Sequence, residues 1–208
     1  MRKIVYNIAK KTEVTMEKER ELTVLNIELD DFIQTLEELG AEKQGEFLQR
    51  RYVYDVKPLN PNKWIRLRTN GTKTTLTIKE IKDKNAIEGT NELEVVVGDF
   101  DKTNEILNEL GYEARNYQEN YRRVYLLGNV EISIDSWPLI PTYAEIEGKT
   151  NEDVERVLKL VNTKNYQTTT FDVESIYREI YGIDIMKVKE LKFGEKKDES
   201  MLEHNKQM

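Results

Sequence analysis

The sequence predicts an α+β fold: a closed antiparallel β-barrel of about eight strands, with helices packed outside it and two similar halves. Three observations support this prediction. Strand-like segments outnumber helical ones and alternate apolar with charged residues, two pairs of them are joined by hairpin turns, and one stretch recurs after 71 residues. A long antiparallel sheet with few helical residues tends to curl and close.

The composition excludes several kinds of chemistry. The 208 residues contain no cysteine and one histidine, His204, so thiol nucleophiles, cysteine-based metal sites and Ser-His-Asp catalysis are not expected. The formal net charge of −7 argues against sequence-independent binding to nucleic acid. No apolar run reaches the length of a membrane span and no signal-peptide pattern opens the chain, so we expect no membrane partner and a cytoplasmic protein.

The domain organisation is simple. Residues 1–18 are polar and rich in Lys and Glu, and we expect them to form an N-terminal extension. Residues 194–208 are predicted to form a polar C-terminal tail that frays. Because no linker rich in Pro, Gly or Ser lies between these segments, residues 19–193 are expected to form one domain.

An internal duplication organises this domain. Residues 19–54 align with residues 90–125 without a gap, and the pattern LxELGxE is followed at the same distance by RxVY in both copies. The alignment makes Arg51 the counterpart of Arg122. Such a repeat predicts two similar halves related by a pseudo-twofold axis.

Each half begins with a strand that is followed by an amphipathic helix. The two helices are expected to begin at Asp and to end at a glycine in the C′ position. The predicted strands include Glu19–Ile27, Glu92–Val97 and Tyr143–Glu147, and the predicted helices are Asp30–Leu39, Asp99–Leu110, 151–161 and 171–181.

Hairpins follow the helices. Asn70-Gly71 suits a two-residue type I′ turn, which would place Arg68 opposite Lys73. The segment YRRVYLL-GN-VEISID predicts a second hairpin, in which Arg122 would lie opposite Asp135.

Charged residues of both signs share one face of these strands, because residues i and i+2 lie on the same side of a strand. On a single strand, a solvated face explains such a pattern. Six strands with the same pattern instead favour a barrel that has its apolar faces under helices and its charged faces in the lumen. The expected lumen residues are Glu19, Glu21, Arg66, Arg68, Lys79, Glu92, Glu94, Arg122, Asp135, Glu145 and Glu147.

A lumen with both signs of charge suits a complex of a metal ion and a polyphosphate. Arginine and lysine bind phosphate oxygens, and clustered carboxylates bind Mg²⁺ or Mn²⁺. The P-loop pattern GxxxxGK[ST] is absent from the sequence, so the usual nucleotide cradle is not expected.

Six features follow one another along the chain: an ExExK-like strand, the RLR, TIKE and ELE strands, a hairpin arginine and the DSWP…EIEG end. In these features, over residues 19–193, the sequence resembles the CYTH superfamily of triphosphate tunnel metalloenzymes. The superfamily includes class IV (CyaB-type) adenylyl cyclases and thiamine triphosphatase. The resemblance implies a triphosphate tunnel that works with a divalent ion, Mg²⁺ or Mn²⁺.

The resemblance also implies roles for individual residues. The metal ligands would be Glu19, Glu21, Asp135, Glu145 and Glu147. The triphosphate would be bound by Arg66, Arg68, Lys79 and Arg122, with Arg51 and Lys73 as weaker candidates. Glu92 and Glu94 would line the tunnel, and Glu147, Lys79 and Arg122 would take part in catalysis.

One position departs from the family pattern. The lysine of ExExK is Thr23 here, which removes one cation from the expected lumen. Arg20 cannot replace it, because neighbouring residues point to opposite faces of a strand. For the same reason Arg123 is expected to face away from the lumen.

The expected function is metal-dependent hydrolysis of inorganic triphosphate or of a nucleoside or thiamine triphosphate. Three alternatives remain open: an adenylate cyclase that converts ATP to cyclic AMP and pyrophosphate, a non-catalytic module that binds polyphosphate or nucleotide, and a structural protein with a solvated sheet. Hydrolysis is favoured because no residues that specify an adenine pocket can be identified. The sequence leaves the metal, the physiological triphosphate and the formation of a homodimer undecided.

Overall fold

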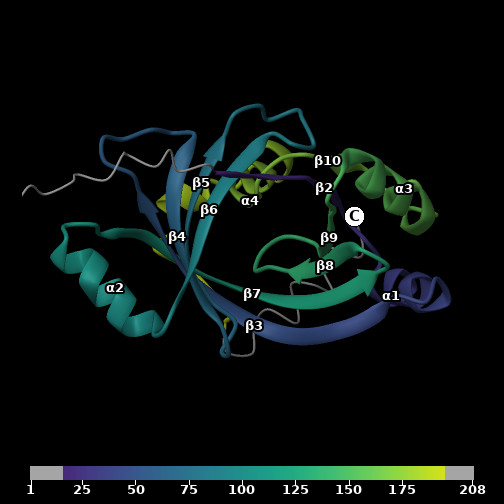
Figure 1. The fold of residues 1–208 in the computed structure, drawn as a ribbon, viewed down its shortest axis with the longest axis horizontal. Coiled ribbons are helices and arrows are strands. Elements are labelled where there is room, and N and C mark those ends of the chain that lie inside the picture. The colour runs from purple at the N-terminus through teal and green to yellow at the C-terminus, as the bar shows by residue number, and fades with distance from the viewer. Residues whose placement is uncertain (1–15, 195–208) are drawn as a thin grey trace, which may run out of the picture.

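One curled antiparallel sheet, with the outline of a half-barrel, dominates the computed structural model, which describes residues 16–194 (Figure 1). Residues 1–15 of the expected N-terminal extension and 195–208 of the expected tail lie outside the described residues. Those two assignments therefore stay predictions.

Within the described residues the sheet has eleven strands, and three of them are only two or three residues long. Their order is β1-β6-β5-β4-β3-β7-β8-β9-β2-β10, and β11 pairs in parallel with β7. The strands are β1 Glu17–Glu19, β2 Glu21–Val24, β3 Glu42–Asp55, β4 Lys63–Thr69, β5 Thr74–Ile81, β6 Thr90–Val97, β7 Ala114–Leu127, β8 Val130–Ser136, β9 Tyr143–Glu147, β10 Thr168–Thr169 and β11 Glu190–Leu191.

Four α-helices accompany the sheet in this part of the chain: α1 Leu29–Glu38, α2 Phe100–Glu109, α3 Asn151–Val161 and α4 Val173–Ser175. The helix predicted over 171–181 is less regular than expected, because α4 passes directly into a π-helical turn, Ile176–Ile180. None of the described helices has the length and apolar character needed to cross a bilayer.

The sheet order contains the two predicted halves. One half is β2-α1-β3-β4-β5 and the other is β6-α2-β7-β8-β9. β3 and β7 pair in the centre, and the strands outward from them match in turn, β4 with β8, β5 with β9 and β6 with β2. Each half therefore completes the sheet of the other, since β6 joins β5 and β2 joins β9.

The segment 17–24 pairs with strands at both ends of the strand order of the sheet. The predicted strand Glu19–Ile27 is divided at Arg20 into β1, which pairs with β6, and β2, which pairs with β9. The last three predicted residues, 25–27, lie beyond the end of β2, and Asn26 among them adopts a φ of 53°. One short stretch of chain thus contacts both edges of the curled sheet.

The β4–β5 hairpin differs from the expected one. Residues 70–73 form a four-residue loop, so Arg68 lies opposite Thr75 and not opposite Lys73. The side chain of Asn70 accepts two backbone hydrogen bonds inside the loop, at 3.0 and 2.7 Å, and so stabilises the longer connection. The change in register is two residues, which leaves the same side chains on the inner face.

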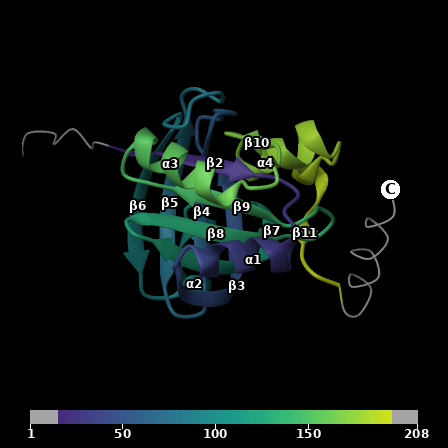
Figure 2. The same cartoon turned by 90° about the vertical axis from the view of Figure 1, so that its right-hand side faces the viewer.

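Helices cover the apolar outer face of the sheet unevenly. α1 and α3 pack over β8, β9 and β2, where Val24, Ile132 and Ile146 are fully buried (Figure 2). On the other half, α2 packs over β4 and buries Leu67. Burial of one such side chain contributes about 1.5–3 kcal/mol to folding, so these clusters hold the sheet in its curl.

The repeated helices provide a matched test of this packing. Leu36 of α1 is fully buried, whereas Leu110, after α2, is 67% exposed. Leu36→Ala is expected to lower the free energy of unfolding by about 2–5 kcal/mol, while Leu110→Ala should change it by less than about 0.5 kcal/mol. Urea unfolding of both variants measures the difference, and equal losses would contradict the described packing of α1.

Candidate active site

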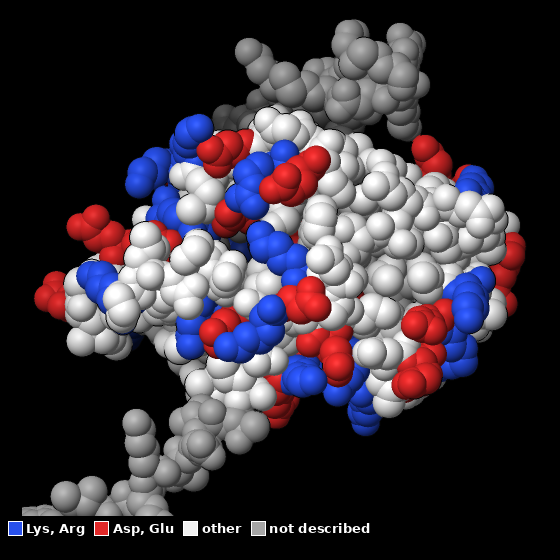
Figure 3. Space-filling view, turned by 90° about the horizontal axis from the view of Figure 1, so that it is seen from above, with Lys and Arg blue, Asp and Glu red and all other residues white. Residues whose placement is uncertain are grey.

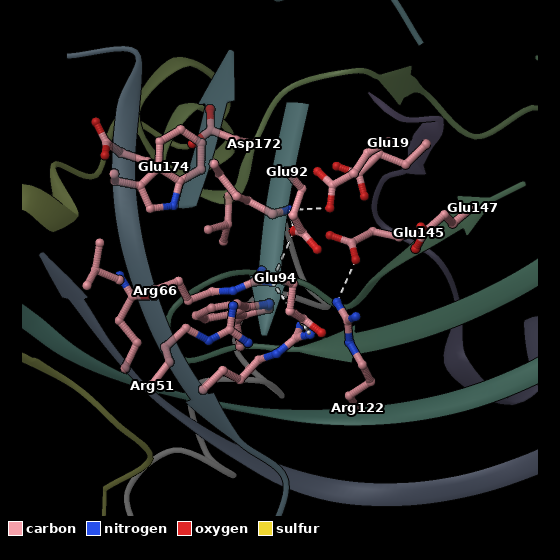
Figure 4. Close-up of a pocket in the computed structure, with 18 of the residues that line it drawn as sticks. Glu19, Arg51, Arg66, Glu92, Glu94, Arg122, Glu145, Glu147, Asp172 and Glu174 are labelled. Atoms are coloured by element: carbon pink, nitrogen blue, oxygen red, sulfur yellow. Dashed lines mark hydrogen bonds and ion pairs between the residues drawn. The ribbon is translucent and has the colours of Figure 1, made fainter. Parts of the chain in front are cut away.

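A cavity of about 310 Å³ lies against the inward faces of the strands, and side chains of both signs line it (Figure 4). Every predicted lumen residue except Asp135 lines this cavity. Its carboxylates are Glu19, Glu21, Glu92, Glu94, Glu131, Glu145, Glu147, Asp172 and Glu174, and its cations are Arg51, Arg66, Arg68, Lys79, Arg115 and Arg122.

Carboxylates form a row on one side of the cavity. Glu131, Glu147 and Glu21 lie directly opposite one another on β8, β9 and β2. Figure 4 shows Glu19 and Glu145 on the same side. Like charges directly opposite each other on neighbouring strands destabilise a sheet. This carboxylate row therefore favours the binding of a cation.

Burial and mutual repulsion change the proton affinity of the carboxylate row. Burial raises the pKa of Glu21 to about 8, with Lys79 opposing the rise and the neighbouring carboxylates adding to it. Burial and the charge of Glu19 raise the pKa of Glu147 to about 7. Glu19 behaves differently: burial opposes the change, but the Lys79 ammonium 2.7 Å away lowers the pKa of Glu19 to about 2.

Arginines form a second group of like charge. Arg51 and Arg68 lie directly opposite each other on β3 and β4, and Arg66 shares their face. The charge of Arg66, together with burial, lowers the pKa of Arg68 to about 9. Burial and the neighbouring arginines lower the pKa of Arg51. Because the Nε atoms of Arg51 and Arg66 are buried without a hydrogen-bond partner among the described residues, this arginine group favours the binding of an anion.

β6 contributes two glutamates that contact the cations. Glu92 lies 3.4 Å from both Arg66 and Lys79. Glu94 lies 3.8 Å from Arg66 and 3.9 Å from Arg68. These separations are longer than a close charge-assisted hydrogen bond, so the glutamates orient the cations and leave them able to bind another anion.

Arg122 is fixed by carboxylates on two strands. The β7–β8 register places it opposite Asp135, as predicted, and its Nε donates to Asp135 Oδ1 at 2.8 Å. Its Nη2 donates to Asp135 Oδ2 and, at 2.5 Å, to Glu145 Oε2. Asn120 also donates to Asp135 Oδ1, at 2.7 Å. Asp135 is fully buried, does not line the cavity and has both oxygens engaged, so its place suits positioning of Arg122. That it ligates a metal ion stays a prediction.

Three other residues singled out in the sequence do not line the cavity. Lys73 lies in the β4–β5 loop with a mostly exposed side chain, 3.6 Å from Glu94. Thr23, which replaces the lysine of the ExExK pattern, is 3% exposed. Arg123 forms an ion pair with Glu46 at 3.1 Å on the outer face, as its position in the strand predicts.

Several lining residues are absent from the sequence prediction. Arg115 lies where the β3–β7 register shifts, and this β-bulge turns it to the inner face against the simple alternation. Glu174 binds Arg115 at 3.1 Å and, like Asp172, comes from a segment distant in the chain. Glu131 differs from these residues, because the alternation along β8 predicts it on the same face as Asp135, where the structure places it.

The carboxylate row fits a hard divalent cation such as Mg²⁺ or Mn²⁺. Its donors are all carboxylate oxygens, which these ions prefer. Glu19 Oε2 is buried and has no hydrogen-bond partner in the described part of the chain. Within residues 16–194 no three acidic or histidine side chains already stand at the spacing of a formed metal site, so closing around an ion requires side-chain rotations.

One face of the molecule carries charges of both signs. Figure 3 shows Lys and Arg side chains interspersed with Asp and Glu side chains over the face seen from above. Recognition of a nucleic-acid backbone uses a continuous basic patch or stripe, and this face presents none.

Comparison with known proteins identifies the class to which this fold and cavity belong. The model of the CYTH domain matches residues 15–178, most of the sequence. The chain therefore belongs to the CYTH family, whose members are typically triphosphatases or adenylyl cyclases. A search of curated proteins finds no significant match.

Solved structures share the fold. A conserved hypothetical protein from Pyrococcus furiosus is 27% identical, with a TM-score of 0.62 over 72% of this chain and 94% of its own. A putative adenylate cyclase from Vibrio parahaemolyticus is 16% identical, with a TM-score of 0.64 over 81% and 99%. A putative adenylyl cyclase from Hippeastrum, described as having a dominant triphosphatase activity, is 15% identical, with a TM-score of 0.52 over 80% and 96%. The last two likenesses extend to the fold alone.

The two neighbouring arginines on β7 allow a matched test of the buried ion pair. Asp135→Ala is expected to lower the free energy of unfolding by about 3 kcal/mol, because it leaves the buried guanidinium of Arg122 with fewer partners. Glu46→Ala removes the exposed partner of Arg123 and should cost less than about 1 kcal/mol. Denaturant titration compares the two variants, and a small loss for Asp135→Ala would argue against its positioning role.

Proposed function

We propose that the protein is a divalent-metal-dependent phosphohydrolase that hydrolyses a triphosphate inside a closed tunnel. One observation carries this proposal: the cavity holds a carboxylate row and an arginine group, and repulsion within each is incompletely compensated. A complex of a metal ion and a triphosphate supplies a cation to the first and an anion to the second. Membership of the CYTH family supports the same substrate class.

The charge balance of the cavity supports binding of metal and phosphate together. Nine carboxylates against six cationic side chains give the lining a formal charge of −3. A polyphosphate alone would be repelled by the carboxylates at short range. A polyphosphate that arrives with divalent cations meets no such barrier.

The arginines have the roles of binding and neutralisation in this proposal. Arg51, Arg66 and Arg68 bind phosphate oxygens, and Arg66 and Arg68 can each do so bidentately because a guanidinium group presents paired N–H donors in one plane. Lys79 and Arg122 neutralise the charge that develops as water attacks the terminal phosphorus. The bond from this phosphorus to the bridging oxygen breaks, which releases orthophosphate and leaves the shortened phosphate chain.

The carboxylate row has the role of holding the ion. Glu19, Glu21, Glu145 and Glu147 are the candidate ligands, since their carboxylates gather on one side of the cavity. When bound, the ion supplies neutralisation and alignment of phosphate oxygens. Glu147 lies at the centre of the row, between Glu21 and Glu131, and is the candidate to orient the attacking water.

An adenylate cyclase is the second candidate. Trp64 lines the same cavity and offers an aromatic surface on which a base could stack. A cyclase would direct the ribose 3′-OH to the α-phosphorus and release pyrophosphate. The same charged groups would serve either reaction, so the products distinguish them.

Product analysis with tripolyphosphate and ATP tests the proposal. We expect metal-dependent release of orthophosphate in Mg²⁺ or Mn²⁺ and no cyclic AMP. Cyclic AMP with pyrophosphate would instead support the cyclase. If neither product forms while triphosphate raises the melting temperature, the protein is a binding module, since a ligand at 100 times its Kd stabilises by about 2.7 kcal/mol.

Substitutions on the two faces of the strands test the site itself. Arg66→Ala is expected to lower kcat/KM for the triphosphate by about 10²–10³-fold, because it removes a charged donor that binds the phosphate oxygens. Glu21→Gln should weaken the dependence of turnover on the divalent ion, because it removes one carboxylate charge from the row.

Arg123→Ala is the matched control, since this arginine lies on the outer face with Glu46. We expect less than about a twofold change in kcat/KM, as for most surface substitutions. If Arg123→Ala is as damaging as Arg66→Ala, the inner face is not the site of the reaction.

A further inference from the structure

Two amide side chains lie at the centre of the β3–β7 pairing. Gln49 and Asn120 are directly opposite each other, and they are also equivalent positions of the repeat, 71 residues apart. Two equivalent residues that face each other lie on either side of the pseudo-twofold axis. Each precedes a repeated arginine of the cavity, Arg51 or Arg122, by two residues and therefore shares its face of the strand. Both amides are buried, and neither has a role in the proposed hydrolysis.

Asn120 uses both ends of its amide. Its Oδ1 accepts a hydrogen bond from Nη2 of Arg51, and its Nδ2 donates to Oδ1 of Asp135 at 2.7 Å. The same oxygen of Asp135 accepts from Nε of Arg122 at 2.8 Å. A continuous chain of hydrogen bonds therefore joins the arginine of one half to the arginine of the other. This link needs a side chain that both donates and accepts, as an amide does and a carboxylate does not.

Arg51 is held so that one edge of its guanidinium stays available to a ligand. Its Cζ lies over the ring of Trp137, 4.6 Å from the ring centroid, and its Nη2 also donates to Oε1 of Gln49 at 2.9 Å. Both acceptors of Nη2 are amide oxygens, which carry no formal charge and so orient the guanidinium without neutralising it. Because the buried Nε has no hydrogen-bond partner among the described residues, this atom can donate to an anion.

We propose that Asn120 is a positioning residue, which orients Arg51 directly and Arg122 through Asp135. The inference rests on the proposed hydrolysis, in which Arg51 binds phosphate oxygens and Arg122 neutralises the charge that develops. Asn120 therefore affects both substrate binding and the chemical step. Gln49 donates or accepts no hydrogen bond to Asp135 within the described residues, so it acts on Arg51 and on binding alone.

Steady-state kinetics with tripolyphosphate and Mg²⁺ separate the two amides. Asn120→Ala is expected to raise KM and to lower kcat by about tenfold each, as for the loss of a hydrogen bond to a charged group. Gln49→Ala is the matched control and should raise KM by a similar factor while changing kcat by less than about twofold. Asn120→Leu has nearly the volume of asparagine without the amide, and it replaces the alanine variant if that variant does not fold. An unchanged kcat or KM in the Asn120 variant, or an equal fall of kcat in Gln49→Ala, would overturn the proposal.

A double-mutant cycle distinguishes positioning from a general loss of structure. In the Arg51→Ala background there is no guanidinium for Asn120 to orient on β3. Adding Asn120→Ala should then change KM by less than about twofold but still lower kcat by about tenfold through Asp135. Effects on KM that multiply in the double variant would overturn the link to Arg51, because independent sites contribute additively to the free energy.

Calorimetric titration keeps this proposal separate from the proposed hydrolysis. If the unmodified protein binds tripolyphosphate with Mg²⁺ but releases no orthophosphate, the hydrolysis is wrong. The dissociation constant then takes the place of KM, and Asn120→Ala is still expected to raise it by about tenfold in the unmodified background and by less than about twofold with Arg51→Ala. A protein that neither binds nor hydrolyses tripolyphosphate would overturn both proposals.

Discussion

The period of two in a β-strand is the constraint on which the rest of this structure depends. On β2, Glu21 points into the cavity while the neighbouring Leu22 packs beneath the helices. A register error of one residue would bury the carboxylate under α3 and turn the leucine into the cavity. The same alternation places Arg122 inside and Arg123 outside on β7. Packing of the helices and assembly of the charged cavity therefore depend on the same strand register.

The cavity gathers charges in an arrangement that works against the stability of the sheet. The row Glu131–Glu147–Glu21 and the pair Arg51–Arg68 put like charges on directly opposed positions. Repulsion in these places is offset by apolar burial on the opposite side of the same strands, where Ile132 and Ile146 are fully buried. Apolar packing on the outer face and like charges on the inner face are typical of proteins in which one face of a sheet provides stability and the other binds a ligand.

Duplication gives the two halves the same framework but different chemistry. Arg51 and Arg122 are equivalent in the repeat, and both line the cavity. Arg122 is held by Asp135 and Glu145, whereas Arg51 faces other arginines. The carboxylate row comes from β2, β8 and β9, and the arginine group comes from β3 and β4. The row thus combines one strand of the first half with two of the second, whereas the arginine group belongs to the first half alone. The cavity therefore has one surface that favours a cation and another that favours an anion.

The sequence by itself determined the strand-rich α+β class, the two halves, the family and the face on which the strand charges lie, with Arg115 as an exception. Alternation and repetition are local properties of the sequence. These predictions therefore hold even though the turn predicted at Asn70-Gly71 is two residues shorter than the loop in the structure. Within a hairpin the sequence also predicted one pair of neighbours, Arg122 and Asp135, but tertiary structure alone decided which charges from distant parts of the chain meet. It placed Asp135 behind Arg122 rather than in the cavity, turned Arg115 inward at a β-bulge, and brought Glu174 to the cavity from the C-terminal segment. The physical reason is that a strand's period fixes the direction of a side chain, whereas bulges, loop lengths and pairing between distant strands fix what that side chain meets.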